Sequence, residues 1–224
     1  MKSTITIFDL IKKVELYDEE AIDIITKAYN VANEAHLGQV RQSGEPYISH
    51  PLSVAYILAS MNADSDTICA GLLHDTIEDT KITKEDIKKE FNEDVANLVD
   101  GVTKISKLNF SSATDMDLAN TRKIITSITE DVRIIIIKIA DRLHNMRTLE
   151  FKSEFKQKKI SLETLELFVP LAYYIGAYNI KREMEDIALK YLKPELYKEI
   201  EEKRSSIVDK CQDSLEDMLE KISF

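Results

Sequence analysis

The chain has 224 residues, which is enough for one large domain or for one domain with a small appendage. Its five glycines and four prolines are too few for the frequent turns of an all-β fold or for a Gly-rich phosphate-binding loop. With 44% hydrophobic and 31% charged residues it can bury a sizeable core, and its formal charge of −10 disfavours binding to nucleic acid or to an anionic membrane.

The first predicted element is an amphipathic helix over about residues 15–36, in which apolar side chains recur at the helical period until Gly38 interrupts them. Residues 38–51 contain two glycines and two prolines, and this composition predicts a structured loop. Pro51 suits the first turn of the helix that follows, with His50 as its capping residue. The rare chain-breaking residues of this protein are therefore concentrated in one loop.

Short helices are predicted next, over about residues 51–59 and over about residues 65–75. Thr83 stands three residues before Asp86, which is the spacing of a capping box, so another helix is expected to begin there, followed by one more. Residues 103–118 lose the helical period and gain Ser, Thr and Asp. This segment is therefore expected to form a flexible loop.

Two further helices are predicted over residues 119–150. The second contains the run VRIIIIKIA at 132–140, whose β-branched residues favour a strand. The run continues without a breaker into ADRLHNMRTLE, which is rich in good helix formers, so we predict a buried helix there. Residues 161–224 predict two or three more helices, the last of them opened by Pro194. Together these elements predict an all-α bundle of about ten helices.

Signals for export or membrane insertion are missing from the sequence. The first twenty residues lack a long apolar core and include several acids, and no stretch approaches the roughly 18 apolar residues of a membrane span. The two cysteines cannot form a disulfide framework, and Cys69 lies in an apolar run where a buried thiol is expected. We therefore expect a cytoplasmic protein with neither a nucleic-acid nor a membrane partner.

One candidate site is the segment LLHDTIED, which places His74 beside Asp75 and adds Glu78 and Asp79. On a helix, Asp75 and Asp79 would lie one turn apart and repel each other at the edge of an apolar stretch. Such stacked carboxylates are costly unless a cation or a shared proton neutralises them. A solvated acidic face is the alternative interpretation.

A second candidate site is the segment IADRLHNMRT, in which Asp141, Asn145 and Thr148 form one polar stripe at spacing i, i+4, i+7. Asp141 is a candidate to complete a metal site with the His-Asp pair of the first segment. Asn145 and Thr148 are then candidates for hydrogen bonds to a ligand. The alternative is that Asp141 forms a surface ion pair with Arg142 or Arg147.

A mixed set of nitrogen and oxygen ligands results when His50 is added to His74, Asp75 and Asp141. Such a set suits Mn²⁺, Fe²⁺ or Zn²⁺ better than a metal that depends on thiolates. Four protein ligands also leave coordination positions for water and substrate, which is the arrangement of a metal-dependent hydrolase.

Five ordered segments over about residues 36–192 resemble a known family: GQVRQSGEPYISHP, AGLLHDTIEDT, LVDGVTK, IKIADRLHNMRTL and ETLELFVPLAYYIGAYNIKREMEDIALKYL. They are similar to the hydrolase domain of RelA/SpoT homologues, the HD-type enzymes of the stringent response. The resemblance implies a single HD-type hydrolase domain over residues 1–224, with 195–224 as a C-terminal helical extension. The chain looks like either a small alarmone hydrolase or the hydrolase fragment of a longer protein, without a synthetase domain.

The resemblance further implies a guanosine-3′,5′-bis(diphosphate) 3′-pyrophosphohydrolase, a phosphoric diester hydrolase that converts ppGpp or pppGpp to GDP or GTP plus pyrophosphate, with one Mn²⁺ per chain. The implied metal ligands are His50, His74, Asp75 and Asp141. The residues that would position and deprotonate the attacking water are Glu78 and Asp79. The implied contacts to the nucleotide are Arg41, which would lie along the guanine, and Ser43, Asn145 and Thr148.

Some features leave alternatives open. Tyr173 and Tyr174 stand where the family often has His or Asn followed by Arg, so an adenine alarmone becomes a candidate substrate if they border the nucleotide pocket. Another nucleotide such as NADPH, or a catalytically silent alarmone-binding role, are further alternatives. The acidic segment after Pro194 suits either packing or self-association, which leaves the oligomeric state open. The cations that could face the pocket are Lys104, Arg122, Lys123, Lys138, Arg142 and Arg147.

Overall fold

The structure is a computed structural model that describes residues 5–107 and 131–222, with side chains as far as residue 208. Within these residues the secondary structure is helical, apart from one isolated bridge between Val40 and Pro46. The prediction of an all-α fold is therefore confirmed. None of the helices in the described ranges combines the length and the apolar character that crossing a bilayer requires.

The helices of the first half are α1 (Ile7–Glu15), a 3₁₀ turn (Glu19–Ala21), α2 (Ile22–Ala35), α3 (Ser49–Ser60), α4 (Ser65–Leu73), α5 (Thr76–Asp79), α6 (Lys84–Glu90) and α7 (Glu93–Ser106). The capping box predicted at Thr83 is present, because its side chain accepts from the backbone of Asp86 and that of Asp86 accepts from the backbone of Thr83. Helix α1 was not predicted, although Thr6 and Asp9 form a second capping box at its start.

The helices of the second half are α9 (Val132–Arg147), a 3₁₀ turn (Leu149–Phe151), α10 (Glu154–Glu163), a π-helical turn (Thr164–Phe168), α11 (Val169–Tyr174), α12 (Tyr178–Leu192) and α13 (Pro194–Ile222). The buried helix predicted over 132–140 and the helix start at Pro194 are confirmed. The predicted loop over 103–118 is wrong for 103–106, which continue α7. The rest of that loop and the helix expected over 119–130 lie outside the described residues.

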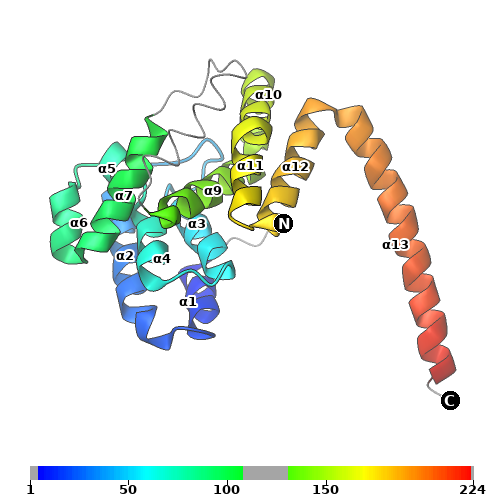
Figure 1. The fold of residues 1–224 in the computed structure, drawn as a ribbon, viewed down its shortest axis with the longest axis horizontal. Helices are drawn as coiled ribbons and strands as arrows, with labels where there is room; N and C mark the ends of the chain where they lie inside the picture. The colour runs from blue at the N-terminus through cyan, green and yellow to red at the C-terminus, as the bar shows by residue number, and fades with distance from the viewer. Residues whose placement is uncertain (1–4, 108–130, 223–224) are drawn as a thin grey trace.

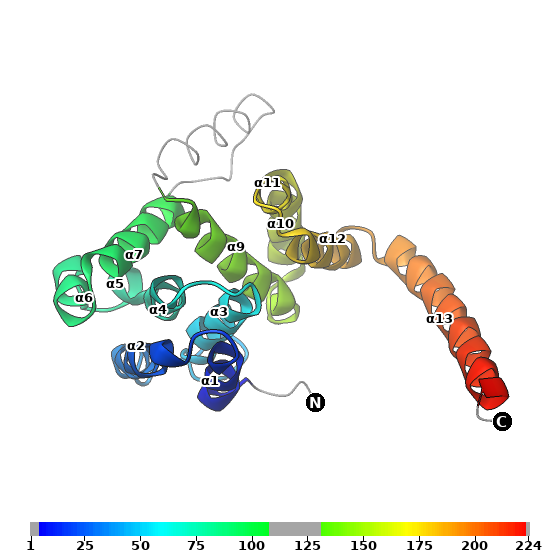
Figure 2. The ribbon, with the colours of Figure 1, turned by 60° about the horizontal axis from the view of Figure 1, so that its bottom comes forward.

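Helix α9 occupies the middle of the bundle, between the N-terminal helices α3 and α7 and the C-terminal helix α12 (Figure 1 and Figure 2). Its buried face includes Ile137 and Ile139, which belong to the same apolar core as Leu58 of α3 and Leu72 of α4. Helix α13 leaves the end of α12 and extends away from the bundle in both views. The site described below forms around α9, where the two halves of the bundle meet.

Helix α4 is buried on all sides from Thr67 to Leu73, as expected for a helix that is apolar around its whole circumference. Gly71 permits the close approach of α3, because a Cβ at this position would overlap Cδ1 of Leu58. Cys69 is fully buried as predicted, and burial raises the pKa of its thiol to about 12. The C-terminal end of this buried helix places the residues that follow it in the protein interior.

Two predicted helix boundaries at the candidate site are wrong. His50 does not cap α3, because the helix begins at Ser49 and Ile48 is its N-cap. Pro51 is accommodated in the first turn, where a backbone N–H has no partner within the helix. The helix predicted through Asp75 ends at Leu73 instead, and His74 and Asp75 form a turn before the short helix α5.

Candidate metal centre and active site

The loop between α2 and α3 is folded back on itself and carries two side chains into the site. The backbone N–H of Arg41 donates to the carbonyl of Glu45 at 2.9 Å, and that of Tyr47 donates to the carbonyl of Gln39 at 3.0 Å. Gly44 closes the turn with a φ of 84°, a conformation that L side chains rarely adopt. The predicted structured loop is confirmed, and it aims Arg41 at α9 and Tyr47 at α5.

Three buried candidate ligand groups meet at one point: His50 in the first turn of α3, His74 in the turn after α4, and Asp141 in α9. One nitrogen or oxygen atom from each lies within 4.8 Å of the others, and together they form a group that can hold a metal ion. Oδ1 of Asp141 is 3.2 Å from Nε2 of His50 and 3.9 Å from Nε2 of His74. The three residues are 2–5% exposed, so solvent contributes little to their interactions.

Asp75 lies on the outer side of this cluster. Its Oδ1 is 3.2 Å from Nε2 of His74, and its Oδ2 is 3.6 Å from Nε2 of His50. The side chain is 20% exposed, which distinguishes it from the three inner groups. The four residues predicted as ligands are thus brought together, with Asp75 placed between the buried cluster and solvent.

The protonation of the cluster fits a bound cation. Nδ1 of His74 donates to the carbonyl of Gly71 at 2.8 Å, so Nε2 is the ring nitrogen that faces the carboxylates and that can hold a proton or a metal ion. This buried Nε2 makes no hydrogen bond of good geometry. Burial opposes a positive charge on His74, but the carboxylates of Asp75 and Asp141 outweigh it and raise the pKa of His74 to about 9. A proton or a metal ion is needed between these groups, and imidazole with carboxylate suits Mn²⁺, Fe²⁺ or Zn²⁺.

The pKa values of the other two inner groups are lowered. Burial lowers the pKa of His50 and outweighs the attraction of Asp141, so the neutral imidazole is favoured. For Asp141, burial alone would raise the pKa, but Lys138 and the two histidines bring it well below its ordinary value. A neutral imidazole and an ionised carboxylate are the protonation states in which these residues bind metals.

Asp141 is held by neighbours on its own helix. Nζ of Lys138 lies 2.7 Å from Oδ2, and the Asn145 side-chain N–H donates to Oδ1 at 2.6 Å. The surface ion pair that was the alternative for Asp141 is not formed. Arg142 contacts Glu163 at 3.0 Å, and Arg147 makes two contacts to Glu183 at 2.6 and 2.8 Å.

Tyr47 connects Asp75 to the acidic helix α5. Its hydroxyl lies 2.7 Å from Oδ2 of Asp75 and 3.0 Å from Oδ2 of Asp79, and it can donate its single hydrogen to only one of them at a time. The ring stacks on His36 with centroids 4.5 Å apart. Burial and the two carboxylates raise the pKa of Tyr47, so the hydroxyl keeps its proton. Tyr47 is not predicted from the sequence, because its partners lie about thirty positions further along the chain.

A cavity of about 430 Å³ opens above the cluster, with opposite charges on its walls. Asp75, Glu78 and Asp79 supply acidic groups, and Glu78 and Asp79 are exposed there. Arg41, Lys138 and Lys152 supply the cationic groups. Among the cations considered from sequence, Lys138 lines this cavity. Lys152 was not predicted, because it lies beyond the segment IKIADRLHNMRTL. It follows the 3₁₀ turn Leu149–Phe151 and lines the smaller cavity.

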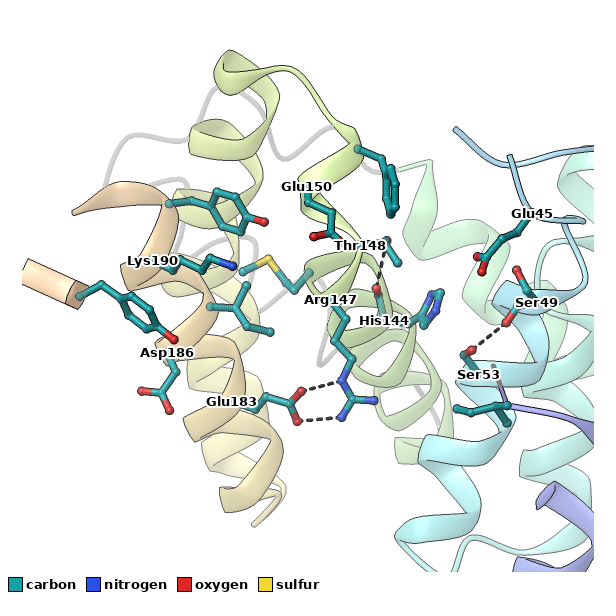
Figure 3. Close-up of a pocket in the computed structure, with 16 residues that line it drawn as sticks. Glu45, Ser49, Ser53, His144, Arg147, Thr148, Glu150, Glu183, Asp186 and Lys190 are labelled. Atoms are coloured by element: carbon teal, nitrogen blue, oxygen red, sulfur yellow. Dashed lines mark hydrogen bonds and ion pairs between the residues drawn. The ribbon is translucent and has the colours of Figure 1, made fainter. Parts of the chain in front are cut away.

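A larger cavity of about 770 Å³ lies between α9 and α12 (Figure 3). Thr148 lines this cavity instead of the smaller one, and its hydroxyl donates to carbonyls of its own helix. The hydroxyl of Ser43 donates to Glu45 at 3.2 Å, and Ser43 lines neither cavity. Tyr173 and Tyr174 also line neither one and are 60% and 78% exposed, so the structure does not place them at the border of these cavities.

Asn145 and Arg41 both line the smaller cavity and contact each other. The amide oxygen of Asn145 accepts from Nη2 of Arg41 at 3.1 Å, while its amide nitrogen is bonded to Asp141. Both polar atoms of Asn145 are therefore engaged by protein groups. The predicted substrate contact of Asn145 would have to share or replace one of these two bonds.

The fold and the site define an HD-type helical protein, and the chain belongs to the HD domain family, whose profile matches residues 28–177. The four predicted ligands and both acids of α5 lie within the matched range. Helix α13 lies outside it.

Individual relatives agree with the resemblance to RelA/SpoT homologues. The chain is 43% identical over 218 residues to a guanosine-3′,5′-bis(diphosphate) 3′-pyrophosphohydrolase of Vibrio cholerae, covering 96% of this chain and 30% of that protein. It is 44% identical over 204 residues to the bifunctional (p)ppGpp synthase/hydrolase SpoT of Escherichia coli K12, covering 91% and 28%. The chain thus spans less than a third of the length of these relatives.

A solved structure described as a metazoan ortholog of SpoT that hydrolyzes ppGpp is also similar, with a TM-score of 0.59 and 26% identity. The match covers 73% of this chain and 92% of that one.

Proposed function

We propose that this protein is a metal-dependent (p)ppGpp 3′-pyrophosphohydrolase. The observation that carries the proposal is the buried group of His50, His74 and Asp141, which lies beneath a cavity with acidic and cationic walls. Relatives named as a guanosine-3′,5′-bis(diphosphate) 3′-pyrophosphohydrolase and as a (p)ppGpp synthase/hydrolase align over 96% and 91% of this chain. The proposed substrate is then a guanosine alarmone, and the proposed biological role is control of the stringent response.

The proposed cofactor is one Mn²⁺ per chain, held by His50, His74, Asp141 and Asp75. When bound, such a cation would neutralise charge on the substrate diphosphate and acidify water. The chemistry of this set suits Mn²⁺, Fe²⁺ or Zn²⁺, and Mn²⁺ is proposed among them because the resemblance to RelA/SpoT homologues implies it.

The acids of α5 are the proposed proton acceptors. Glu78 and Asp79 would orient a water molecule in the smaller cavity, and one of their carboxylates would take a proton as the water oxygen bonds to the 3′-linked phosphorus. The bond from that phosphorus to the 3′-oxygen breaks at the same time. The 3′-oxygen takes up a proton to become the hydroxyl of GDP or GTP, and pyrophosphate leaves.

The whole chain carries a formal charge of −10, which repels an anionic substrate. The negative charge of the substrate would therefore be balanced by cationic side chains close to the site. Lys138 and Lys152 face the smaller cavity and are the proposed partners of the phosphates. Burial first, and then the positive charges of Arg41 and Lys156, lower the pKa of Lys152. We place the nucleoside toward Arg41 and Thr148, where the larger cavity begins, with Ser43 and Asn145 as further contacts.

We also propose that the chain forms one HD-type domain, with residues 195–224 as a C-terminal helical extension. This part of the chain forms most of α13, which projects from the bundle (Figure 1).

Pyrophosphate release tests the proposed function. Purified protein with Mn²⁺ would be offered ppGpp, pppGpp, the corresponding adenine alarmone and NADPH in parallel. Fastest release from the guanosine compounds supports the proposal. Faster turnover of the adenine compound or of NADPH would replace the proposed substrate, and ppGpp binding without turnover would indicate a silent regulator. Asp23→Asn, which changes an exposed acid on α2, serves as the control for site variants.

A further inference from the structure

His144 has no role in the chemistry described so far, yet it contacts a proposed metal ligand directly. It lies on α9, three residues after Asp141, and its imidazole packs beside that of His50 with ring centroids 4.9 Å apart. The two Nδ1 atoms are separated by 2.7 Å. In Figure 3, the side chain of His144 extends from α9 toward Ser49 and Ser53 of α3.

The short distance between the two Nδ1 atoms requires exactly one hydrogen between them, because two lone pairs or two N–H groups would repel each other. Nε2 of His50 faces Asp141 at 3.2 Å and Asp75 at 3.6 Å, which is the direction of the metal position. A His50 that ligates through Nε2 carries its hydrogen on Nδ1. Nδ1 of His144 is then the acceptor.

A second contact supports the same assignment. Nη1 of Arg41 lies 3.4 Å from Nδ1 of His144, and a guanidinium group can only donate. His50 and Arg41 are both donors to Nδ1 of His144, so this atom must carry a lone pair. The ring hydrogen of His144 is then on Nε2.

We infer that His144 is a positioning residue whose Nδ1 lone pair fixes His50 in the tautomer that presents Nε2 to the metal. This inference rests on the proposed metal-dependent function. Outer partners of this kind set the orientation and basicity of a ligating imidazole. The same lone pair also receives Arg41, so the arginine proposed to hold the nucleotide and a metal ligand share one acceptor atom.

Two substitutions separate the acceptor role from packing. His144→Phe keeps an aromatic ring without an acceptor, whereas His144→Asn is smaller but places a carbonyl oxygen near the position of Nδ1. Calorimetric titration of the substrate-free protein with Mn²⁺ should show affinity reduced roughly 10- to 100-fold in His144→Phe, and within a few-fold of wild type in His144→Asn. Met146→Leu, at another buried position on α9, is the control and should leave the affinity unchanged.

If His144 only fills space, the ring of His144→Phe should preserve binding better than the smaller His144→Asn. Tighter Mn²⁺ binding by His144→Phe than by His144→Asn would overturn the inference. Equal Mn²⁺ affinity in His144→Phe and wild type would also overturn it, and so would a wild-type protein that binds no Mn²⁺. Circular dichroism of each metal-free variant shows whether it is folded. Long-range ¹⁵N–¹H spectra of the Zn²⁺-loaded wild type give a second test, in which a hydrogen on Nδ1 of His144 would contradict the assignment.

The test of His144 can fail or succeed independently of the test of the proposed function. A wild-type protein that binds Mn²⁺ but releases no pyrophosphate from ppGpp refutes the proposed reaction, while the affinity order of the two variants still tests His144. In an active enzyme, saturating Mn²⁺ should restore much of the kcat of His144→Phe, because the lesion lies in holding the metal.

Discussion

The hydroxyl of Tyr47 lies 2.7 Å from Oδ2 of Asp75, so a residue of the loop before α3 holds the outermost of the four proposed metal ligands. The same hydroxyl is 3.0 Å from Asp79 of α5. The single hydroxyl hydrogen of Tyr47 can thus be donated either to a proposed metal ligand or to a proposed proton acceptor. Because these two carboxylates lie one helical turn apart, Tyr47 also relieves the repulsion between them.

Tyr47→Phe should lower kcat and weaken Mn²⁺ binding. A hydrogen bond to a charged group is worth about 1.5–3 kcal/mol, which corresponds to roughly a 10- to 100-fold loss in the steps that use it. Steady-state kinetics and Mn²⁺ titration measure the effect. Tyr56→Phe is the matched control, since Tyr56 is half-buried on α3 and its hydroxyl has no hydrogen-bond partner within the described structure. Equal kinetics in the two variants would rule out a role for the Tyr47 hydroxyl.

Asp75→Ala should abolish metal binding and hydrolysis together. The substitution removes a carboxylate that approaches both imidazoles, and loss of a ligand should exceed the roughly 10- to 100-fold effect of losing an outer partner. Metal content after dialysis against Mn²⁺, compared with that of Asp23→Ala, provides the measurement. Retained Mn²⁺ affinity would contradict the assignment of Asp75 as a ligand.

Glu78→Gln should lose turnover while still binding metal and substrate. Removal of a general base typically costs about 10²- to 10⁴-fold in rate, whereas Glu78 makes no contact with the buried cluster that would affect Mn²⁺. Single-turnover kinetics and Mn²⁺ titration distinguish the two effects, with Glu85→Gln on α6 as a control at another exposed glutamate. A rate within a few-fold of wild type would leave Asp79 as the proton acceptor.

Mn²⁺ affinity should rise with pH up to about 9. The pKa of His74 in the metal-free protein is raised to about 9, since the attraction of Asp75 and Asp141 exceeds the effect of burial. Below that pH, the metal must displace a proton from His74, so affinity should fall by up to about tenfold for each unit of pH. Calorimetry in buffers of different ionisation enthalpy should detect release of about one proton. Binding that is independent of pH and releases no proton would show that His74 is already neutral.

Gly71→Ala should destabilise the fold by about 1–3 kcal/mol, as overpacking does in a close-packed core. The added methyl group would overlap Cδ1 of Leu58 where α4 contacts α3. Urea denaturation of the metal-free protein measures the change, and Leu58→Val in the same chain should recover part of it. Wild-type stability in the single variant would mean that Leu58 can adopt another rotamer without cost.

The sequence by itself determined the helical class, the buried run in α9, the start of α13 and the four candidate ligands. Periodicity, capping residues and motif spacing are local properties, so they could be read along the chain. The end of α4 at Leu73 and the position of His50 inside α3 were not predicted, because both depend on how buried helix ends pack.

Only the tertiary structure decided how the candidate ligands are held. His144 and Tyr47 contact partners on other elements, and Lys152 lines the smaller cavity. Nothing in local spacing predicts a contact between α9 and the first turn of α3. The same packing turned Thr148 toward the larger cavity and left Tyr173 at the surface. Side-chain pairs across helices follow from the burial of α4 and the central place of α9, which are properties of the whole bundle.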